Sequence, residues 1–145
     1  MTRVHRQRWV LALAMAGAVL AAPALAGSLT SQVNRLEPLI LGNEQSEFYM
    51  SRKEYHLTAG KYYRWKITSS GRREYNIVAP ELWRNAWIYQ VKVGDKEIKV
   101  PALDELDFDS AGDEEVYFVP INAGTYEFRS RGLEQRGMVG KIIVE

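Results

Sequence analysis

Apolar and polar residues alternate with a period of two along much of the chain after Glu47, which predicts half-buried β-strands. The clearest example is 61–68 (Lys-Tyr-Tyr-Arg-Trp-Lys-Ile-Thr). In this run Tyr63, Trp65 and Ile67 fall on one face, and the polar residues between them fall on the other. We therefore expect a strand of a sheet that has one buried side and one wet side.

Further strand-like segments follow, rich in Val, Ile, Tyr and Phe and separated by turn residues. We expect strands at 75–78, on both sides of Gly94-Asp95 within 91–100, and at 116–119, 125–128 and 141–144. Pro80 is suited to the first turn of a short helix near 81–88. Short strands with frequent turns predict an all-β antiparallel sandwich.

The segment 101–115 is strongly acidic, and its carboxylates come from Asp104, Glu105, Asp107, Asp109, Asp113, Glu114 and Glu115. Such a segment is typical of a solvated loop or a protected sheet edge. Oxygen ligands of this kind also suit Ca²⁺, but the fixed Asp and Gly positions of a hand-type calcium loop are missing. We therefore expect a loop or edge here.

The first 26 residues have a basic start, an apolar stretch from Trp9 to Leu20 and a small-residue end at Ala26. This three-part pattern predicts a secretory signal peptide, 1–26, and a periplasmic mature protein. An uncleaved anchor is the competing interpretation, although the apolar stretch is shorter than the ~20 residues that span a bilayer. We expect 27–46 to be a linker with one strand or short helix, and 47–145 to be the folded domain.

Charge and cysteine content narrow the function classes. The predicted leader contains three Arg and no acid, so the remaining 119 residues hold 16 Lys and Arg against 18 Asp and Glu. This balance argues against nucleic acid as a partner. The chain has no Cys, so packing must stabilise it without disulfides. No nucleophile–base pair or cofactor motif is visible, so we expect neither enzymatic activity nor a cofactor.

The C-terminal segment carries the most specific signal. Residues 124–144 run Gly-Thr-Tyr-Glu-Phe-Arg-Ser-Arg-Gly-Leu-Glu-Gln-Arg-Gly-Met-Val-Gly-Lys-Ile-Ile-Val, preceded by Phe118-Val-Pro. This order of turn, strand, loop and final strand resembles the end of the cupredoxin, or blue-copper, family. The resemblance covers about 47–145 and implies a cupredoxin-like Greek-key β-sandwich.

In that family the closing loop carries a Cys, a His and a Met as copper ligands, and an upstream His is usually followed by Asn. The resemblance places Ser130 at the Cys position, Leu133 at the loop His position and Met138 at the Met position. It places Tyr75 at the upstream His position, followed by Asn76. The chain therefore resembles a divergent member that lacks the type 1 copper ligands.

Composition supports the same exclusion. A blue-copper site needs one thiolate and two imidazoles with a weak axial ligand. The chain has no Cys, and its His residues are His5, in the predicted leader, and His56. We expect Ser130 to fill the vacated site without acting as a nucleophile, and Met138 to pack in the core. The Tyr75 hydroxyl is expected to point at Ser130 or at solvent.

The resemblance also brings one group of cations to the former copper end of the sandwich. The candidate partner-binding residues are Arg72, Arg73, Arg129, Arg131 and Arg136. Guanidinium groups suit carboxylates, so an acidic periplasmic protein is the expected partner. The alternative is ordinary charge at strand ends, neutralised in part by Glu74, Glu127 and Glu134.

These observations favour an exported accessory protein that binds a partner through the former copper end, without membrane insertion after signal cleavage. One alternative keeps copper or other metal binding, or a role related to electron transfer, through a non-blue site made from Met138, His56 or carboxylates. A second alternative is a carbohydrate-binding sandwich with an exposed aromatic platform. The candidate aromatics are Tyr49, Tyr55, Tyr62, Tyr63, Trp65, Trp83, Trp87 and Tyr89.

Overall fold

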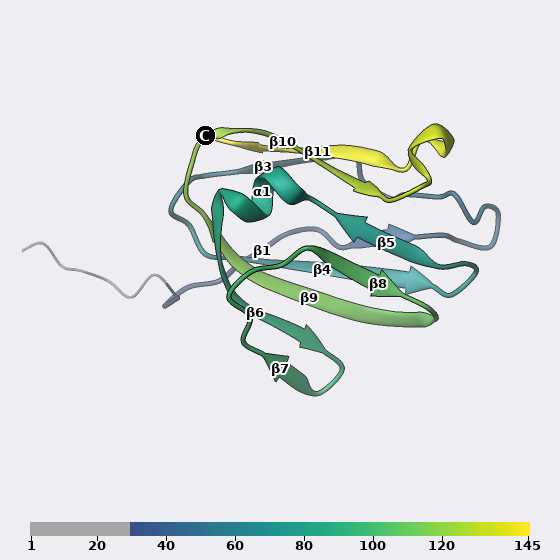
Figure 1. Ribbon diagram of the computed structural model, residues 1–145, viewed down its shortest axis with the longest axis horizontal. Coiled ribbons are helices and arrows are strands. Elements are labelled where there is room, and N and C mark those ends of the chain that lie inside the picture. Colours follow the sequence, from purple (N-terminus) through teal and green to yellow (C-terminus); the bar gives the residue numbers. More distant parts are fainter. Residues whose placement is uncertain (1–29) are drawn as a thin grey trace, which may run out of the picture.

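A computed structural model describes residues 30–145, so the predicted signal peptide lies outside the described residues. The described chain forms two β-sheets that face each other, with a short α-helix beside them (Figure 1). The predicted all-β sandwich is confirmed. Within residues 30–145, no helix has the length and apolarity needed to cross a membrane.

The first sheet, sheet A, has the strand order β1-β4-β9-β6-β7, and β2 also pairs with β4. Its strands are β1 (Asn34–Arg35), β2 (Leu39–Leu41), β4 (Tyr63–Ser70), β6 (Ala86–Val93), β7 (Lys96–Ile98) and β9 (Ala111–Pro120). The pairs β1–β4 and β2–β4 are parallel, and the others are antiparallel. The β6–β7 hairpin extends beyond the rest of the sandwich at the bottom of Figure 1.

The second sheet, sheet B, has the strand order β3-β11-β10-β5-β8. Its strands are β3 (Glu54–Leu57), β5 (Tyr75–Val78), β8 (Glu105–Phe108), β10 (Gly124–Ser130) and β11 (Val139–Val144). The edge strand β3 runs parallel to β11, whereas the other pairs are antiparallel. Both sheets are therefore mixed, and the expectation of purely antiparallel pairing was wrong at their edges.

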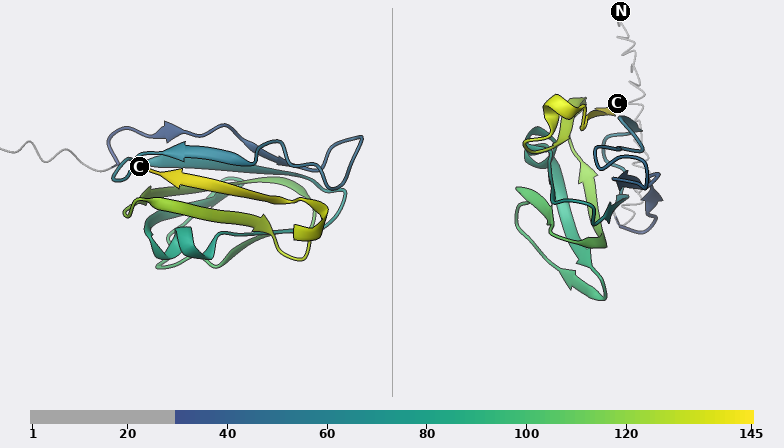
Figure 2. Two further views of the ribbon diagram at one scale, coloured as in Figure 1. Left: turned by 90° about the horizontal axis from the view of Figure 1, so that it is seen from above. Right: turned by 90° about the vertical axis from the view of Figure 1, so that its right-hand side faces the viewer.

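Aromatic rings fill the space between the sheets. Trp65 of sheet A contacts two rings of sheet B. Its ring centroid lies 5.3 Å from that of Phe128 and 5.6 Å from that of Tyr55. Trp83 joins this cluster from outside the sheets and meets Phe118 edge to face. The predicted inner face of β4 is confirmed, because its residues alternate strictly between buried and half-buried. Figure 2 shows the two layers from above and end-on.

The predicted helix is present but short. The helix α1 (Pro80–Arg84) begins with Pro80 in its first turn and buries Leu82 and Trp83. It ends before Asn85, and Trp87, which the prediction placed in the helix, belongs to β6. Pairing with β9 from Ala86 onward satisfies the backbone that a longer helix would have used.

Two further segments, 27–46 and the acidic run 101–115, also contain strands. The segment 27–46 was expected to be a linker with one strand or short helix, outside the folded domain. Instead, its described part contains two short strands, β1 and β2, that pair with β4 and belong to sheet A. Part of the acidic run forms the edge strand β8, in agreement with the expected sheet edge. The expectation of a loop or edge was wrong for Asp113, Glu114 and Glu115, which lie in β9, a central strand of sheet A that pairs with β4 and β6. The β4–β5 turn, the β8–β9 turn and the β10–β11 loop all lie at the right-hand end of Figure 1.

Candidate functional site

The β10–β11 loop closes one end of the sandwich. After Ser130 the chain forms a short 3-10 helix, η1 (Glu134–Arg136), and Gly137 turns it into β11 with φ 79°, a conformation that favours glycine. The backbone of the loop is closed by hydrogen bonds. The Ser130 N–H donates to Met138 O at 3.0 Å, and the Leu133 N–H donates to Ser130 O at 3.0 Å. Ser130, Leu133 and Met138, which the resemblance matches to three of the four copper ligands, are therefore adjacent.

Strand β5 brings the fourth position, Tyr75, beside this loop. Ile77 of β5 pairs with Ser130, and the Arg131 N–H donates to Asn76 O at 2.8 Å. Tyr75 and Ile77 are two residues apart on one strand and are both buried, so they share the inner face of sheet B with Ser130. The four positions that the resemblance matches to copper ligands thus lie at one end of the sandwich.

The hydrogen bond of Tyr75 differs from our expectation. Its hydroxyl donates to the backbone carbonyl of Glu47 at 2.7 Å, so the predicted contact with Ser130 or solvent was wrong. The Ser130 Oγ is buried and has no hydrogen-bond partner in the described chain. Gly42 makes room for the Tyr75 hydroxyl, because a Cβ at Gly42 would lie 2.2 Å from the Tyr75 oxygen.

The donor atoms at these positions are poor metal ligands. Tyr75, Ser130 and Met138 are fully buried, and Leu133 is 9% exposed. Together they offer a phenol, a hydroxyl and one thioether, whereas copper of the blue type requires a thiolate and imidazoles. His56 does not supplement them, because it is exposed on β3 and its Nε2 lies 2.7 Å from Glu54 Oε1. Ser130 likewise has no imidazole base beside it for nucleophilic chemistry.

Phe48 connects two of the predicted arginines. The guanidinium carbon of Arg73 lies 5.0 Å from the centroid of the Phe48 ring, and that of Arg136 lies 4.8 Å from it. Arg73 also forms an ion pair with Glu47 at 3.1 Å. Phe48 was not among the predicted site residues. In the sequence, Phe48 differs from its surroundings only as an aromatic residue within a polar stretch.

The other predicted arginines have different surroundings. Arg129 pairs with Glu127 at 3.0 Å and with Glu134 at 3.2 Å, and Arg131 pairs with Glu105 at 2.9 Å. The neutralisation expected for Glu127 and Glu134 is therefore present. Arg129 and Arg131 are held by carboxylates of the same chain, which leaves them less available to a partner.

Arg72 is exposed in the β4–β5 turn and has no ion pair within the part of the chain that the structure describes. Arg136 is also exposed and contacts Phe48 rather than a carboxylate. The structure thus gathers Arg73 and Arg136 on Phe48, and Arg72 precedes Arg73 in the chain. We call Phe48, Arg72, Arg73 and Arg136 the Phe48 end.

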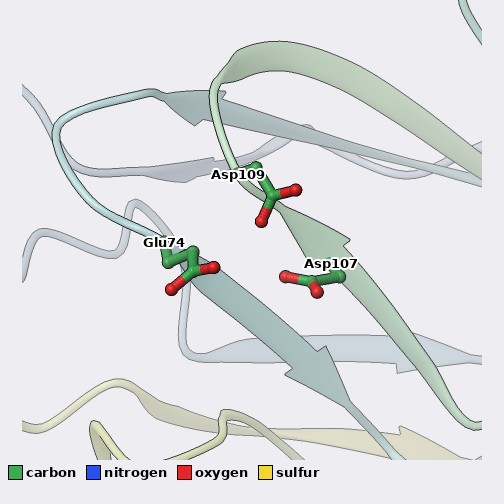
Figure 3. Close-up of side chains that lie close together, drawn as sticks. All are labelled: Glu74, Asp107 and Asp109. Atoms are coloured by element: carbon green, nitrogen blue, oxygen red, sulfur yellow. The ribbon is translucent and has the colours of Figure 1, made fainter.

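Glu74, expected to neutralise the arginines, lies in an acidic group instead. Its carboxylate and those of Asp107 and Asp109 all lie within 4.8 Å of one another (Figure 3). A hydrogen bond shared with Asp109, together with the charges of Asp109 and Asp107, raises the pKa of Glu74. All three side chains are exposed at the β5–β8 edge of sheet B, and such a group by itself defines no metal site.

The comparisons with known proteins define the fold. No family model matches the chain, and no curated protein matches it. Among solved structures, it is similar to a multicopper oxidase from Campylobacter jejuni that is described as a metallo-oxidase, with a TM-score of 0.55 and 11% sequence identity. The match covers 79% of this chain and 31% of the oxidase chain.

At this level of identity the similarity concerns the fold alone. The chain has a cupredoxin-like fold, and the predicted fold class is confirmed. The chain spans about a third of the length of the oxidase that it matches.

Proposed function

We propose that this protein is a divergent cupredoxin-like accessory protein that is exported, has no blue-copper centre and binds an acidic partner protein through the Phe48 end. The contact of Arg73 and Arg136 with one aromatic ring is the observation that carries the proposal. It joins the β2–β3, β4–β5 and β10–β11 loops into one surface, in which a half-buried aromatic ring lies between guanidinium groups. Aromatic and Arg side chains are enriched in protein interfaces.

The proposed loss of copper rests on the chemistry of the buried end. Ser130 and Leu133 occupy the positions of a thiolate and an imidazole in the resemblance, and both are buried. The mature sequence expected after cleavage contains no Cys and one His. The required donor set for a blue-copper centre therefore cannot be assembled within one chain.

The proposed partner is acidic because of the charge that stays unpaired at the Phe48 end. Arg72 and Arg136 form no ion pair within residues 30–145, whereas Arg129 and Arg131 already have carboxylate partners. A carboxylate-rich surface would pair with the free guanidinium groups and pack against Phe48. Long-range attraction between such surfaces also accelerates association at low salt.

Metal analysis of the protein recovered from the periplasm, without chelator or affinity tag, tests the first half of the proposal. We expect the measured mass to be that of a chain that starts at Gly27. We also expect no stoichiometric copper, and no intense visible absorption after addition of Cu(II). Stoichiometric binding of copper or another transition metal would favour the alternative of a non-blue site. An uncleaved mass in the membrane fraction would contradict export as a cleaved protein.

Charge reversal tests the second half. We expect the doubly substituted Arg72→Glu/Arg136→Glu protein to lose a specific acidic protein that the unmodified protein captures by cross-linking in periplasmic extract. The matched control is Lys61→Glu/Lys96→Glu, which reverses two exposed charges outside the Phe48 end. Identical capture by all three proteins would refute docking through this end. Circular dichroism confirms that each variant remains folded.

A further inference from the structure

A strip of aromatic rings covers part of the outer face of sheet A, outside the core and away from the β10–β11 loop. The rings belong to Trp87 and Tyr89 of β6, to Tyr62 just before β4, and to Tyr117 of β9. Successive ring centroids lie 5.6 Å (Trp87–Tyr89), 5.8 Å (Tyr89–Tyr62) and 6.1 Å (Tyr62–Tyr117) apart. These four residues form a continuous surface that we call the aromatic strip.

An irregularity in β6 limits the outward-facing side chains of the strip to those up to Tyr89. The register of β6 against β9 shifts between Ile88 and Gln90, so Tyr89 is an additional residue in the strand. Trp87 and Tyr89 are two residues apart and both reach the outer face, and the additional residue turns Val91 back to the core. An uninterrupted alternation would have placed Val91 on the same side as the two aromatic residues.

The strip has a buried middle and an exposed end. Tyr62 is 7% exposed between its two neighbours, whereas 44% of Trp87 is exposed. Trp87 meets Tyr89 with an angle of 65° between the ring planes, an edge contact that leaves its indole accessible to a ligand. Self-packing explains the position of Tyr62, but it does not cover Trp87. An exposed aromatic end beside a buried one is a candidate stacking site.

Cations without carboxylate partners border the strip. The Lys99 Nζ lies 3.6 Å from the centroid of the Tyr89 ring and also donates a hydrogen bond to Gln90. Lys92 projects from the same strand as Tyr89, and Arg35 pairs in register with Arg64 of β4. None of Lys92, Lys99 and Arg35 forms an ion pair with a carboxylate of residues 30–145.

A pocket of about 240 Å³ lies at the Tyr117 end of the strip. Arg64 lines this pocket and is the register partner of Tyr117 on the neighbouring strand. Arg35, Arg64 and Lys66 contribute its cations, and Glu37 is the acidic residue among its lining residues. The Arg64 Nε is buried and has no hydrogen-bond partner, although the same side chain forms an ion pair with Glu115. Because Arg64 and Lys66 have carboxylate partners, Arg35 is the lining cation with no ion pair within residues 30–145, and it is the candidate contact for an anionic ligand group.

We propose that the outer face of sheet A binds a saccharide that carries carboxylates, with sugar rings stacked on Trp87 and Tyr89 and a carboxylate held by Arg35. A pyranose ring has an apolar C–H face that packs on an aromatic ring, while its hydroxyl groups need hydrogen-bond partners. Lys99 and Gln90 lie beside Tyr89 and supply such partners. The unpaired cations account for the preference for an acidic sugar.

Single-stranded nucleic acid is the competing ligand, since it also combines stacking with negative charge. It requires a groove of strong positive charge along the backbone. Here Arg64 and Lys66 are paired with Glu115 and Asp113, and Glu97 is a further acid opposite Lys92. This modest excess of positive charge fits a few carboxylates better than a phosphate at every unit.

Binding of short oligogalacturonate and alginate oligomers, measured by titration calorimetry and tryptophan fluorescence, tests the proposal. Trp65 and Trp83 are buried, so a shift in emission on binding would report Trp87. We expect at least one of the two acidic oligomers to bind. A neutral oligosaccharide of equal length and single-stranded DNA should bind more weakly. Failure of both acidic oligomers, or preferential binding of the DNA, would overturn the proposal.

Variants locate the site. We expect Trp87→Ala and Arg35→Ala each to weaken binding by roughly tenfold, which corresponds to the loss of one stacked ring or one ionic contact. The controls are Tyr49→Ala, an aromatic residue of similar exposure outside the strip, and Arg136→Ala at the Phe48 end. Unchanged affinity in Trp87→Ala would contradict stacking on the strip. Because Arg136→Ala affects only protein docking, its result separates this site from the proposed partner surface.

Discussion

At the residue scale, the hydroxyl of Tyr75 links the inner face of sheet B to the loop before β3. Its acceptor is the Glu47 carbonyl, next to Phe48 in the chain, and Gly42 leaves the space through which the ring reaches this oxygen. A buried side chain thus holds the segment that carries the half-buried Phe48. The residue at the position of a copper-binding His in the resemblance has a structural contact instead.

Replacing Tyr75 with Phe tests this contact. We expect Tyr75→Phe to lower the free energy of unfolding by about 1–2 kcal/mol, because the partly buried Glu47 carbonyl loses its donor while the ring still packs. Urea denaturation with an unchanged m-value would measure the loss. The control is Tyr49→Phe, whose exposed hydroxyl has no hydrogen bond in the structure and whose removal should change little. Equal stabilities of the two variants would show that the Tyr75 bond has no net effect.

At the element scale, the close packing of β11 between β10 and β3 depends on Gly140. A Cβ at this position would lie 2.3 Å from Phe128 Cζ and 2.9 Å from the Lys53 carbonyl oxygen. Phe128 is itself fully buried against Trp65, so its ring has little room to move away. Gly140 therefore allows β11 to lie close to the Phe128 ring and to the backbone before β3.

We expect Gly140→Ala to destabilise the protein by about 1–3 kcal/mol, because the added methyl group forces Phe128 or the β3 backbone to shift. The midpoint of urea denaturation measures the change. Gly112→Ala is the matched control, since a Cβ there meets nothing within 4 Å and the strand is exposed at that point. A destabilisation of equal size in both variants would point to backbone effects rather than to the clash.

The acidic group at the β5–β8 edge leads to a prediction about pH. Glu74 has a raised pKa in the folded protein, so the folded state binds a proton more tightly than the unfolded state. The destabilising effect of its ionisation therefore develops as pH rises through the ordinary carboxyl pKa, and it is complete above the raised one. Below both values the group is protonated in either state and the effect is absent.

Asp109→Asn removes the largest of these influences on Glu74. We expect a higher thermal melting temperature than that of the unmodified protein at pH 7 and low salt, and a difference that disappears as the pH falls below 4. Glu44→Gln, an exposed acid with no ion pair in the described chain, is the control for loss of a negative charge. A gain that persists at acidic pH would show that relief of repulsion is not its cause.

At the scale of the whole molecule, the two candidate binding surfaces belong to different parts of the sandwich. The Phe48 end is built from loops that connect strands of both sheets, whereas the aromatic strip lies across neighbouring strands of sheet A. Substitutions at one surface should therefore leave binding at the other unchanged. Residues more than about 10 Å apart without shared partners usually act independently.

The amino-acid sequence by itself determined the fold class and the position of most strands. Alternation of apolar and polar residues identified the inner face of β4, and β5 was predicted with its observed bounds. These features are local, because a strand that is buried on one side must repeat its pattern every two residues. The absence of Cys and the scarcity of His likewise follow from composition alone.

Only the tertiary structure decided how side chains from distant segments meet. The acceptor of the Tyr75 hydroxyl, the sharing of Phe48 by Arg73 and Arg136, and the pairing of Arg131 with Glu105 all join residues that are far apart in the sequence. The β6 irregularity that turns Val91 back to the core depends on the register with β9. Such contacts depend on strand pairing and loop path, which a period of two along one segment does not specify.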